Sequence, residues 1–273
     1  MTSQLSSPPP PPAFLRVRHD QPRLLTPLRR RLRHAYVRAT EMGLFGLVPL
    51  KTHVVICGYP RSGTTLLQAM METSSADARS YGRERSALSV AKYTWPGRSP
   101  IVISKLPDDI FRVDQIRDYY RDLQTDVRFV LSVRDPRAVL TSIFVDKPGY
   151  CVPSIKWRAV YEHIQYQRQF DDVIVTEYRD LVETPGAVQD RLAEFTGCHT
   201  RLRFEEFHRA VPGHFDTRPL NGVRPIDRGS LDKWRRPEHK ARIQEILREI
   251  PELPDRLIEL GYEIDTAWMQ EYR

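Results

Sequence analysis

One stretch of the chain, residues 53–66, limits the possible folds more than any other part. It reads HVVICGYPRSGTTL. The β-branched apolar residues 54–56 are typical of a buried strand, and the apolar positions between 66 and 71 recur at helical spacing. Gly58 and Gly63 bound the intervening loop and let its N–H groups turn inward, where the start of the next helix adds a positive dipole end. The stretch therefore predicts a strand, a phosphate-binding loop and a helix in direct succession.

The loop matches the nucleotide-binding pattern G-x-x-x-x-G-K-[ST] at three of its positions. Gly58, Gly63 and Thr65 are in register, but Thr64 replaces the lysine, and the cation of the loop is Arg61, three residues earlier. With this cation the run resembles the 5′-phosphosulfate loop, P-[KR]-S-G-T-[TS], of sulfotransferases that use 3′-phosphoadenylyl sulfate (PAPS). The resemblance implies that the donor is bound by Tyr59, Pro60, Arg61, Ser62, Gly63, Thr64 and Thr65.

Further apolar runs predict the remaining strands of an α/β domain. They extend from Pro100 to Ser104, from Asp126 to Val133 and from Asp172 to Thr176. Helical patterns separate them, one over 157–164 and one that begins at Thr184-Pro185 and ends before Gly197. Strands that alternate with helices pair in parallel through right-handed crossovers, and they place ligands at the carboxyl edge of the sheet. We therefore expect a three-layer, doubly wound, mostly parallel sheet.

A second signature lies in residues 133–142, which read VRDPRAVLTS. Arg134 closes a predicted strand, Asp135 can cap the helix that Pro136 begins, and Ser142 is expected two turns into that helix. A guanidinium and a hydroxyl in this arrangement can bind one phosphate together. The run resembles the 3′-phosphate motif R-[ND]-P-R-[DA]-x-x-x-S of the same family. The resemblance implies that Arg134 and Ser142 bind the 3′-phosphate, within a P-loop NTPase-like sulfotransferase fold.

Two other segments resemble the family more loosely. Residues 177–181, EYRDL, are similar to its Y-E-D-L strand end, which implies that Tyr178 lies near the adenine; a buried structural tyrosine is the alternative. Residues 227–230, DRGS, are similar to the loop that closes over the 3′-phosphate. Cytosolic members have Arg-Lys-Gly there, and only Arg-Gly matches. The resemblance implies contacts from Arg228 and from the backbone of Gly229.

The resemblance also indicates how the acceptor is activated. Cytosolic sulfotransferases carry T-H-L-P with a catalytic histidine, whereas residues 104–107 of this chain read SKLP and lack it. Other branches use a glutamate after the first helix and a lysine in a K-x-P stretch, which Glu84 and Lys105 match. This implies Glu84 as general base, Lys105 as a cation on the sulfuryl group and Arg61 on the departing phosphate. An ordinary surface charge cluster with its two arginine neighbours is the alternative for Glu84.

Composition divides the chain into three regions. Residues 1–20 are Pro-rich and predict a disordered tail, residues 21–50 predict a basic helical segment, and residues 51–273 predict a single sulfotransferase domain. The basic helix either packs on its own domain or contacts an anionic membrane peripherally. No apolar run reaches the length of a membrane span and the start lacks a signal-peptide layout, so we expect a cytoplasmic protein.

The net charge and the cysteine content limit the classes of ligand that the sequence predicts. The formal charge of +7 favours an anionic partner, and the three cysteines are too scattered for a metal site, so no metal is expected. The basic residues follow no recognisable nucleic-acid-binding motif, so no nucleic acid is expected either. The acceptor can be a small molecule, a carbohydrate or a lipid, and the oligomeric state stays open.

Two other functions fit part of this pattern. A P-loop small-molecule or nucleoside kinase would use the same loop, with a lysine expected at position 64, although some P-loop proteins carry it elsewhere, and with an acidic Mg²⁺ ligand, for which Asp135 is the candidate. A non-catalytic nucleotide-binding module would use the same residues without turnover. The predicted function is transfer of a sulfuryl group from PAPS to a hydroxyl or amine, with release of 3′-phosphoadenosine 5′-phosphate (PAP).

Overall fold

The computed structural model describes residues 6–10, 31–32, 35, 48–93, 99–144 and 148–272 of the chain. The expected tail and basic segment therefore lie almost entirely outside the described residues. Within the second of them, residues 31–32 and 35 are described as helical, and residues 48–50 are described without a helix. In the described part of the chain, no helix is long and apolar enough to cross a membrane.

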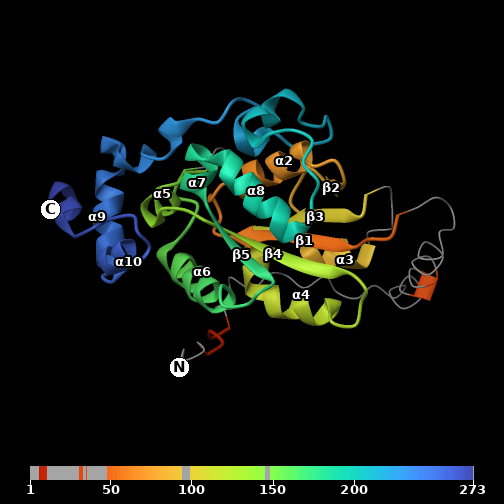
Figure 1. Ribbon diagram of the computed structural model, residues 1–273. Coiled ribbons are helices and arrows are strands. Elements are labelled where there is room, and N and C mark those ends of the chain that lie inside the picture. The colour runs from red at the N-terminus through yellow and green to blue at the C-terminus, as the bar shows by residue number, and fades with distance from the viewer. Residues whose placement is uncertain are drawn as a thin grey trace.

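Five strands form one sheet in the order β2-β3-β1-β4-β5, with every pairing parallel (Figure 1). They are β1 (Thr52–Gly58), β2 (Ala78–Ser80), β3 (Ile101–Lys105), β4 (Asp126–Val133) and β5 (Val173–Glu177). The four runs expected from the sequence are confirmed as β1, β3, β4 and β5. Strand β2 was not expected, because three residues are too few to show an alternating pattern.

Helices cover both faces of the sheet, as Figure 1 shows. The α-helices are α2 (Thr64–Ser74), α3 (Ala87–Tyr93), α4 (Val113–Tyr120), α5 (Pro136–Leu140), α6 (Ser154–Gln167), α7 (Tyr178–Glu183), α8 (Pro185–Thr196), α9 (Lys240–Glu249) and α10 (Leu253–Glu259). The 3₁₀-helices are η3 (Pro107–Arg112), η4 (Phe204–Arg209), η5 (Arg218–Leu220), η6 (Arg228–Ser230), η7 (Lys233–Arg235), η8 (Pro237–His239) and η9 (Ala267–Tyr272).

The alternation of side chains along β1 accounts for the three layers. Val54 and Ile56 are buried in one apolar cluster with residues of α2 and α8. Val55 and Cys57 are buried in the other, with residues of α3, α4 and α6. Because successive side chains of a strand point to opposite faces, an unbroken apolar run such as residues 54–57 requires cover on both sides. The expected three-layer, doubly wound α/β fold is confirmed.

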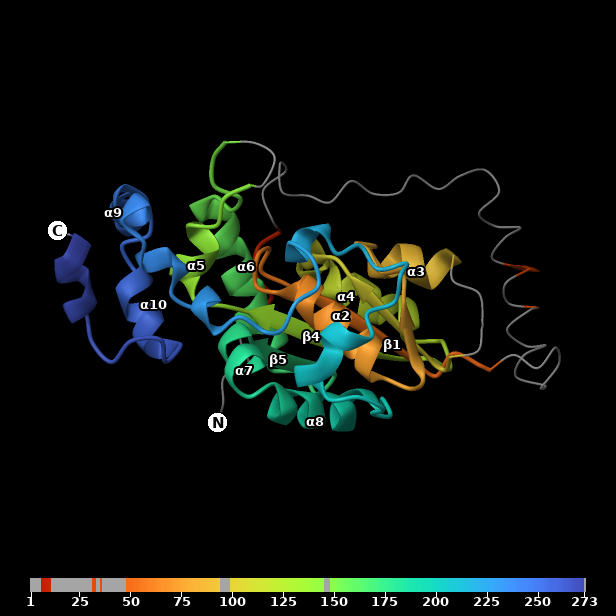
Figure 2. The same ribbon diagram turned by 90° about the horizontal axis from the view of Figure 1, so that it is seen from above.

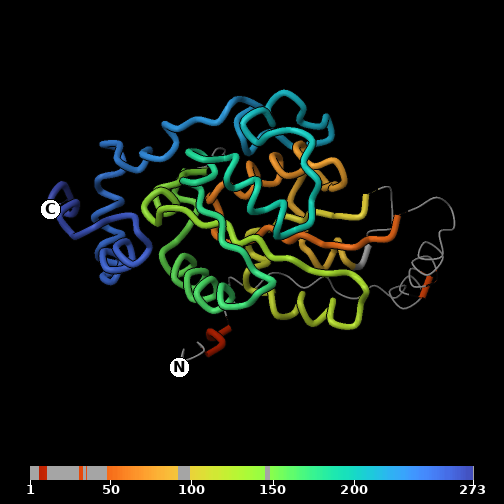
Figure 3. Tube along the Cα trace, viewed as in Figure 1, coloured from red at the N-terminus to blue at the C-terminus, as the bar shows by residue number. Residues whose placement is uncertain are grey.

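The C-terminal helices α9 and α10 lie at one end of the molecule, beyond α5 (Figures 2 and 3). Ile243 and Leu257 nevertheless share the buried cluster of Val55. Arg137 joins this region to the sheet. Its guanidinium carbon lies 3.8 Å from the ring centroid of Trp234, and it pairs with Asp135 and with a carboxylate that follows α10.

Helix α5 is shorter than the sequence suggests. Asp135 caps it, accepting a hydrogen bond from the backbone N–H of Arg137 over 2.8 Å, as expected. However, the helix ends at Leu140, so the expectation that Ser142 lies two turns into it is wrong. The backbone leaves the helix because Ser142 O accepts from Cys151 N over 2.7 Å and residue 143 bridges to residue 150 in antiparallel fashion.

Candidate active site

The loop after β1 depends on glycine at both of its ends. Gly58 has φ +124°, and a Cβ added there would lie 2.4 Å from the carbonyl oxygen of Ser132. Gly63 has φ +85°, and an added Cβ would lie 2.4 Å from Cδ2 of Tyr178. A side chain at either position would therefore be strained by its backbone and would also clash. The predicted glycine positions are explained by these two close approaches.

Ser62 and Tyr59 attach the loop to Ser132 of β4. Ser62 is fully buried and its Oγ donates to the carbonyl of Tyr59 over 2.6 Å. Ser132 Oγ donates to the carbonyl of Ser62 over 2.9 Å, and Tyr59 N donates to the carbonyl of Ser132 over 3.1 Å. Ser132 was not expected from the sequence, because only the folded sheet brings it under the loop. The side chain of Ser62 and the backbone of Tyr59 thus shape the loop.

Arg61 has an unusual backbone and a side chain that reaches another element. Its φ of +67° lies in the left-handed region, which non-glycine residues rarely adopt. Its Nε donates to Oγ of Ser142 over 2.8 Å, at an exposed position. Although α5 ends early, Ser142 therefore still lies beside the loop. The two residues expected at opposite ends of the donor are in direct contact.

The guanidinium of Arg134 contacts two backbone carbonyls and one aromatic ring. Its Nη1 donates to the carbonyl of Arg61 over 3.0 Å and its Nη2 to the carbonyl of Ser230 over 2.7 Å. The guanidinium carbon lies 4.2 Å from the ring centroid of Tyr178, whose hydroxyl is 2.9 Å from Oγ of Ser230. Burial lowers the pKa of Arg134 from its usual value. Ser230 was not singled out from the sequence, although it directly follows the predicted Arg-Gly pair.

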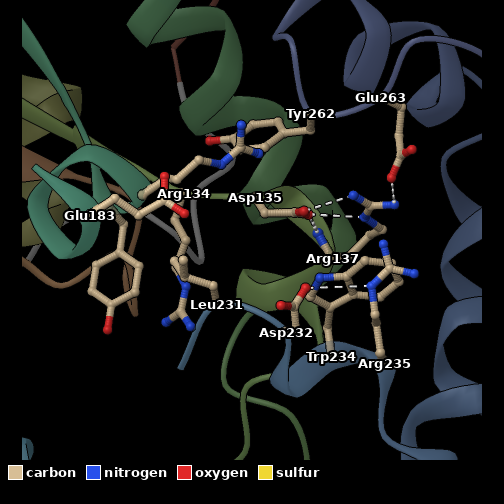
Figure 4. Close-up of a pocket in the computed structure, with 12 residues that line it drawn as sticks. Arg134, Asp135, Arg137, Glu183, Leu231, Asp232, Trp234, Arg235, Tyr262 and Glu263 are labelled. Carbon is tan, nitrogen blue, oxygen red and sulfur yellow. Dashed lines mark hydrogen bonds and ion pairs between the residues drawn. The ribbon is translucent and has the colours of Figure 1, made fainter. Parts of the chain in front are cut away.

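A cavity of about 160 Å³ opens beside Arg134, and Figure 4 shows the residues that line it. Arg134 and Tyr178 border it, and on its far side Arg137 is neutralised by Asp135 and Glu263. In contrast, no carboxylate of the described residues pairs with Arg134, and its Nε is a buried donor without a partner in that part of the chain. A buried cation with an unused donor favours an anionic ligand.

Lys105 is the last residue of β3, directly beside Ile56 of β1. It is only 1% exposed, and its Nζ donates to Oγ1 of Thr65 over 3.0 Å and to Oε1 of Glu84 over 2.8 Å. Burial lowers the pKa of Lys105, while Glu84 and, more weakly, Asp216 oppose the shift. The predicted pair of Glu84 and Lys105 is therefore brought together at the start of α2.

The segment that carries Glu84 is fixed on both sides. Arg85 N donates to the carbonyl of Lys105 over 2.9 Å, in an antiparallel bridge. Ala87 N, at the start of α3, donates to Oδ2 of Asp109 over 2.6 Å. Asp109 is fully buried, and burial raises its pKa to about 6. The glutamate is thus held beside Lys105 by its neighbours in the chain, although its own side chain is 57% exposed.

Arg228 and Gly229 do not join the other site residues. Arg228 is exposed, and the backbone N–H of Gly229 donates to Oδ1 of its own cap residue, Asp227, over 2.9 Å. Of this segment, Ser230 is the residue that contacts Arg134. As for metals, no group of His, Cys, Asp and Glu in the described ranges is arranged to hold an ion.

Comparison with known proteins places this geometry in a family. The protein-family model named sulfotransferase domain matches residues 51–212 of this chain. Similar solved structures include the sulfotransferase domain of the Synechococcus PCC 7002 olefin synthase (19% identity, 68% of this chain and 87% of that chain, TM-score 0.49). A second is STF9 from Mycobacterium avium (14% identity, 81% of this chain and 81% of that chain, TM-score 0.44). A third is mouse SULT7A1 complexed with PAP (14% identity, 73% of this chain and 83% of that chain, TM-score 0.41). No curated protein matches. Since the family match spans more than half of the chain, the protein belongs to the sulfotransferase domain family.

Proposed function

We propose that the chain transfers a sulfuryl group from PAPS to a hydroxyl or amine of a small-molecule, carbohydrate or lipid acceptor and releases PAP. The observation that carries the proposal is the convergence of Arg61, Ser142 and Arg134 at one end of the sheet. Two guanidinium groups and a hydroxyl around one glycine-bounded loop suit a ligand with phosphate at both ends. In this proposal residues 51–273 act as one domain.

The donor site combines the loop with the end of β4. The loop N–H groups, Arg61 and Thr65 would bind the 5′-phosphosulfate, and Arg134 and Ser142 the 3′-phosphate. The unused Nε of Arg134 and the cavity that Arg134 lines support this assignment. The complete proposed donor set is Tyr59, Pro60, Arg61, Ser62, Gly63, Thr64, Thr65, Arg134, Ser142, Tyr178, Arg228 and Gly229. For Gly229 to take part, its N–H must first leave Asp227.

The transfer itself requires charge stabilisation more than covalent chemistry. The bound PAPS supplies the sulfuryl group, and the sulfur–oxygen bond to its 5′-phosphate breaks as the acceptor attacks in line. Arg61 and the loop N–H groups stabilise charge on the departing phosphate, and the ammonium of Lys105 lies on the sulfuryl side, at Thr65. Glu84 holds this ammonium in place and is the base expected from the sequence.

The chain belongs, in this proposal, to a branch without the histidine of cytosolic sulfotransferases. At the corresponding position Lys105 ends β3 and points to Thr65 and Glu84. A lysine there supplies a fixed positive charge, whereas it is a poor acceptor of the proton while it remains charged. The proton of the acceptor must therefore be taken by another group.

The kinase alternative is disfavoured by the contacts of Thr65. In P-loop kinases the hydroxyl at this position binds Mg²⁺, which neutralises the phosphates. Here the hydroxyl of Thr65 accepts a hydrogen bond from the ammonium of Lys105, so a protein cation already lies at that point. Thr64, in the position of the kinase lysine, is buried. Both observations favour a donor whose transfer needs no metal.

The experiment is transfer of ³⁵S from labelled PAPS in the presence of EDTA, with a panel of sugar, lipid, phenol and amine acceptors. We expect a labelled product whose mass, read by mass spectrometry, has increased by one sulfonate. Transfer of ³²P from γ-labelled ATP, dependent on Mg²⁺, would instead identify a kinase. Tight retention of PAP without turnover on any acceptor would identify a binding module.

A further inference from the structure

A histidine–carboxylate pair lies near Glu84, outside the residues discussed so far. Nε2 of His214 is 3.0 Å from Oε1 of Glu72, which lies on α2. The side chain of Glu72 is 6% exposed and that of His214 is 54% exposed. A buried carboxylate behind a half-exposed imidazole is an arrangement that orients the ring and leaves its other nitrogen accessible.

The hydrogen bonds of Glu72 determine which nitrogen of His214 is available. The carboxylate accepts from the backbone N–H and the hydroxyl of Ser80, and Ser80 Oγ in turn accepts from Gly82 N over 2.9 Å. A carboxylate held by these donors is an acceptor for Nε2–H of the imidazole. In neutral His214 this assigns the proton to Nε2 and leaves Nδ1 as a bare acceptor, for which the described part of the chain provides no hydrogen-bond donor.

The pair lies beside the segment that carries Glu84. Gly82, two residues before Glu84, has φ +65°, and an added Cβ would lie 2.7 Å from the carbonyl oxygen of His214. Asp216 N donates to the carbonyl of Gly82 over 2.7 Å, and the Asp216 charge acts on Lys105. The segment 214–216 and the Glu84 segment are therefore packed together next to the proposed sulfuryl site.

Helix α2 connects the same two places. Thr65, which contacts Lys105, and Glu72, which contacts His214, are seven residues apart and so lie on one face of the helix, about 10 Å apart along its axis. Gln68 lies between them on this face and donates to Ser80 over 3.1 Å. One polar face of α2 thus leads from the sulfuryl site to the imidazole.

We propose that His214, oriented by Glu72, is the general base that takes the proton of the acceptor. This inference rests on the proposed function. The acceptor oxygen forms its bond to sulfur, the electron pair of the broken sulfur–oxygen bond stays on the 5′-phosphate, and the acceptor proton moves to Nδ1. The resulting imidazolium is stabilised by Glu72 and returns its proton to solvent. Oε1 of Glu84 already accepts a hydrogen bond from the ammonium of Lys105, so this oxygen is occupied.

The test uses the full chain and water as the acceptor, so that no acceptor needs to be known. Release of ³⁵S-sulfate from labelled PAPS is measured for the wild type, for His214→Ala and for His214→Ala with added imidazole. We expect His214→Ala to lower the rate about 10² to 10⁴-fold, as for loss of a general base. Added imidazole should restore part of the loss, which would not happen if His214 were merely structural. PAP affinity, measured by calorimetry, should stay at the wild-type value.

His199→Ala is the matched control. His199 also pairs with a carboxylate, Asp77, over 2.6 Å, but at the start of β2, the opposite end of that strand from Ser80. Its loss should leave sulfate release unchanged. Wild-type rates in His214→Ala, or a loss that imidazole does not restore while Glu84→Gln is equally inactive, would overturn the assignment in favour of Glu84. If the wild type neither binds PAP nor releases sulfate, the proposed function fails, and the inference with it.

Discussion

Arg61 donates from Nε to Oγ of Ser142 over 2.8 Å, although 81 residues separate the two in sequence. The sequence motifs assign Arg61 to the reactive end of the donor and Ser142 to its ribose phosphate. Their contact means that both halves of the proposed donor site form one surface before any donor binds. Arg134 stabilises this surface by donating a hydrogen bond to the carbonyl of Arg61.

The first prediction separates the side chain of Arg61 from its backbone. Arg61→Gly should lower sulfuryl transfer about 10² to 10³-fold, because the departing phosphate loses its cation. The free energy of unfolding should change by no more than about 1 kcal/mol, since release from the left-handed conformation offsets the greater freedom of unfolded glycine. Urea unfolding and ³⁵S transfer measure the two effects.

Asn221→Gly is the control for that variant. Asn221 is the other described non-glycine residue with positive φ, at +53°, and it is exposed at the end of η5. It should keep wild-type transfer. Wild-type transfer in Arg61→Gly as well would remove Arg61 from the site.

The second prediction concerns the charge of Lys105. Burial lowers its pKa, so the ammonium should be lost at a lower pH than that of an ordinary lysine, near 10.4. The kcat should therefore fall on the alkaline side before an exposed lysine would titrate. In Lys105→Arg the cation persists, so this alkaline limb should move to higher pH whatever the absolute rate.

The sign of the stability effect is opposite to that of the activity. Since the folded pKa of Lys105 is the lower one, the unfolded chain binds more protons between the two pKa values. The free energy of unfolding should then rise with pH in that window as far as Lys105 is concerned. An unchanged alkaline limb in Lys105→Arg would show that another group controls the rate.

The third prediction tests Asp109, which holds the start of α3 behind Glu84. Burial raises its folded pKa to about 6, above the value near 3.9 of an unfolded chain, so the protonated form favours the fold. Its contribution is fully present below about pH 4 and is lost as pH rises through 6. Asp109→Asn keeps an oxygen for Ala87 N and should raise the free energy of unfolding by roughly 3 kcal/mol at pH 7.5.

The comparison between two pH values checks this prediction. Urea unfolding at pH 4 should give nearly equal free energies for wild type and Asp109→Asn, and the difference should grow toward pH 7.5. A difference that is the same at both pH values would mean that Asp109 is not the titrating group.

The fourth prediction exploits two glycines with similar backbones. Gly63 has φ +85° and faces Tyr178, whereas Gly197, which ends α8, has φ +74° and has no atom within 4 Å of an added Cβ. Gly197→Ala should cost about 1 kcal/mol of stability through strain alone and keep PAP affinity. Gly63→Ala should also displace Tyr178 and weaken PAP binding at least about 10-fold, because the loop and the ring that stacks on Arg134 shift together. Equal PAP affinity of the two variants in calorimetry would contradict the proposed loop.

The parts of the fold that were predictable are those fixed by local sequence. The apolar runs gave four of the five strands within a residue or two, and Pro185 and Gly197 marked both ends of α8. Thr184 occupies the expected N-cap position, but its hydroxyl donates to Asp180. The early end of α5 was not predictable, because it depends on pairing with the 149–151 segment, which no local pattern announces.

The site shows the same division. The motifs predicted Arg61, Lys105 and Arg134 as candidate site residues, because each follows or ends a strand at the edge of the sheet where ligands bind. The sequence did not predict the contact of Ser230 or the pairing of Glu72 with His214. Their partners are 50 to 150 residues away in sequence and are brought together only by the folded chain. Serine and histidine in irregular segments carry no spacing signal of their own.

The most direct test of the donor site is calorimetry with PAP and AMP, which differ by the 3′-phosphate. If Arg134 and Ser142 bind that phosphate, the wild type should bind PAP at least about 10-fold more tightly than AMP, as expected for a charge-assisted contact. Arg134→Ala should remove most of this preference while its AMP affinity changes little. Equal affinity of the wild type for PAP and AMP would contradict the assignment of the second phosphate site, and with it the choice of PAPS as donor.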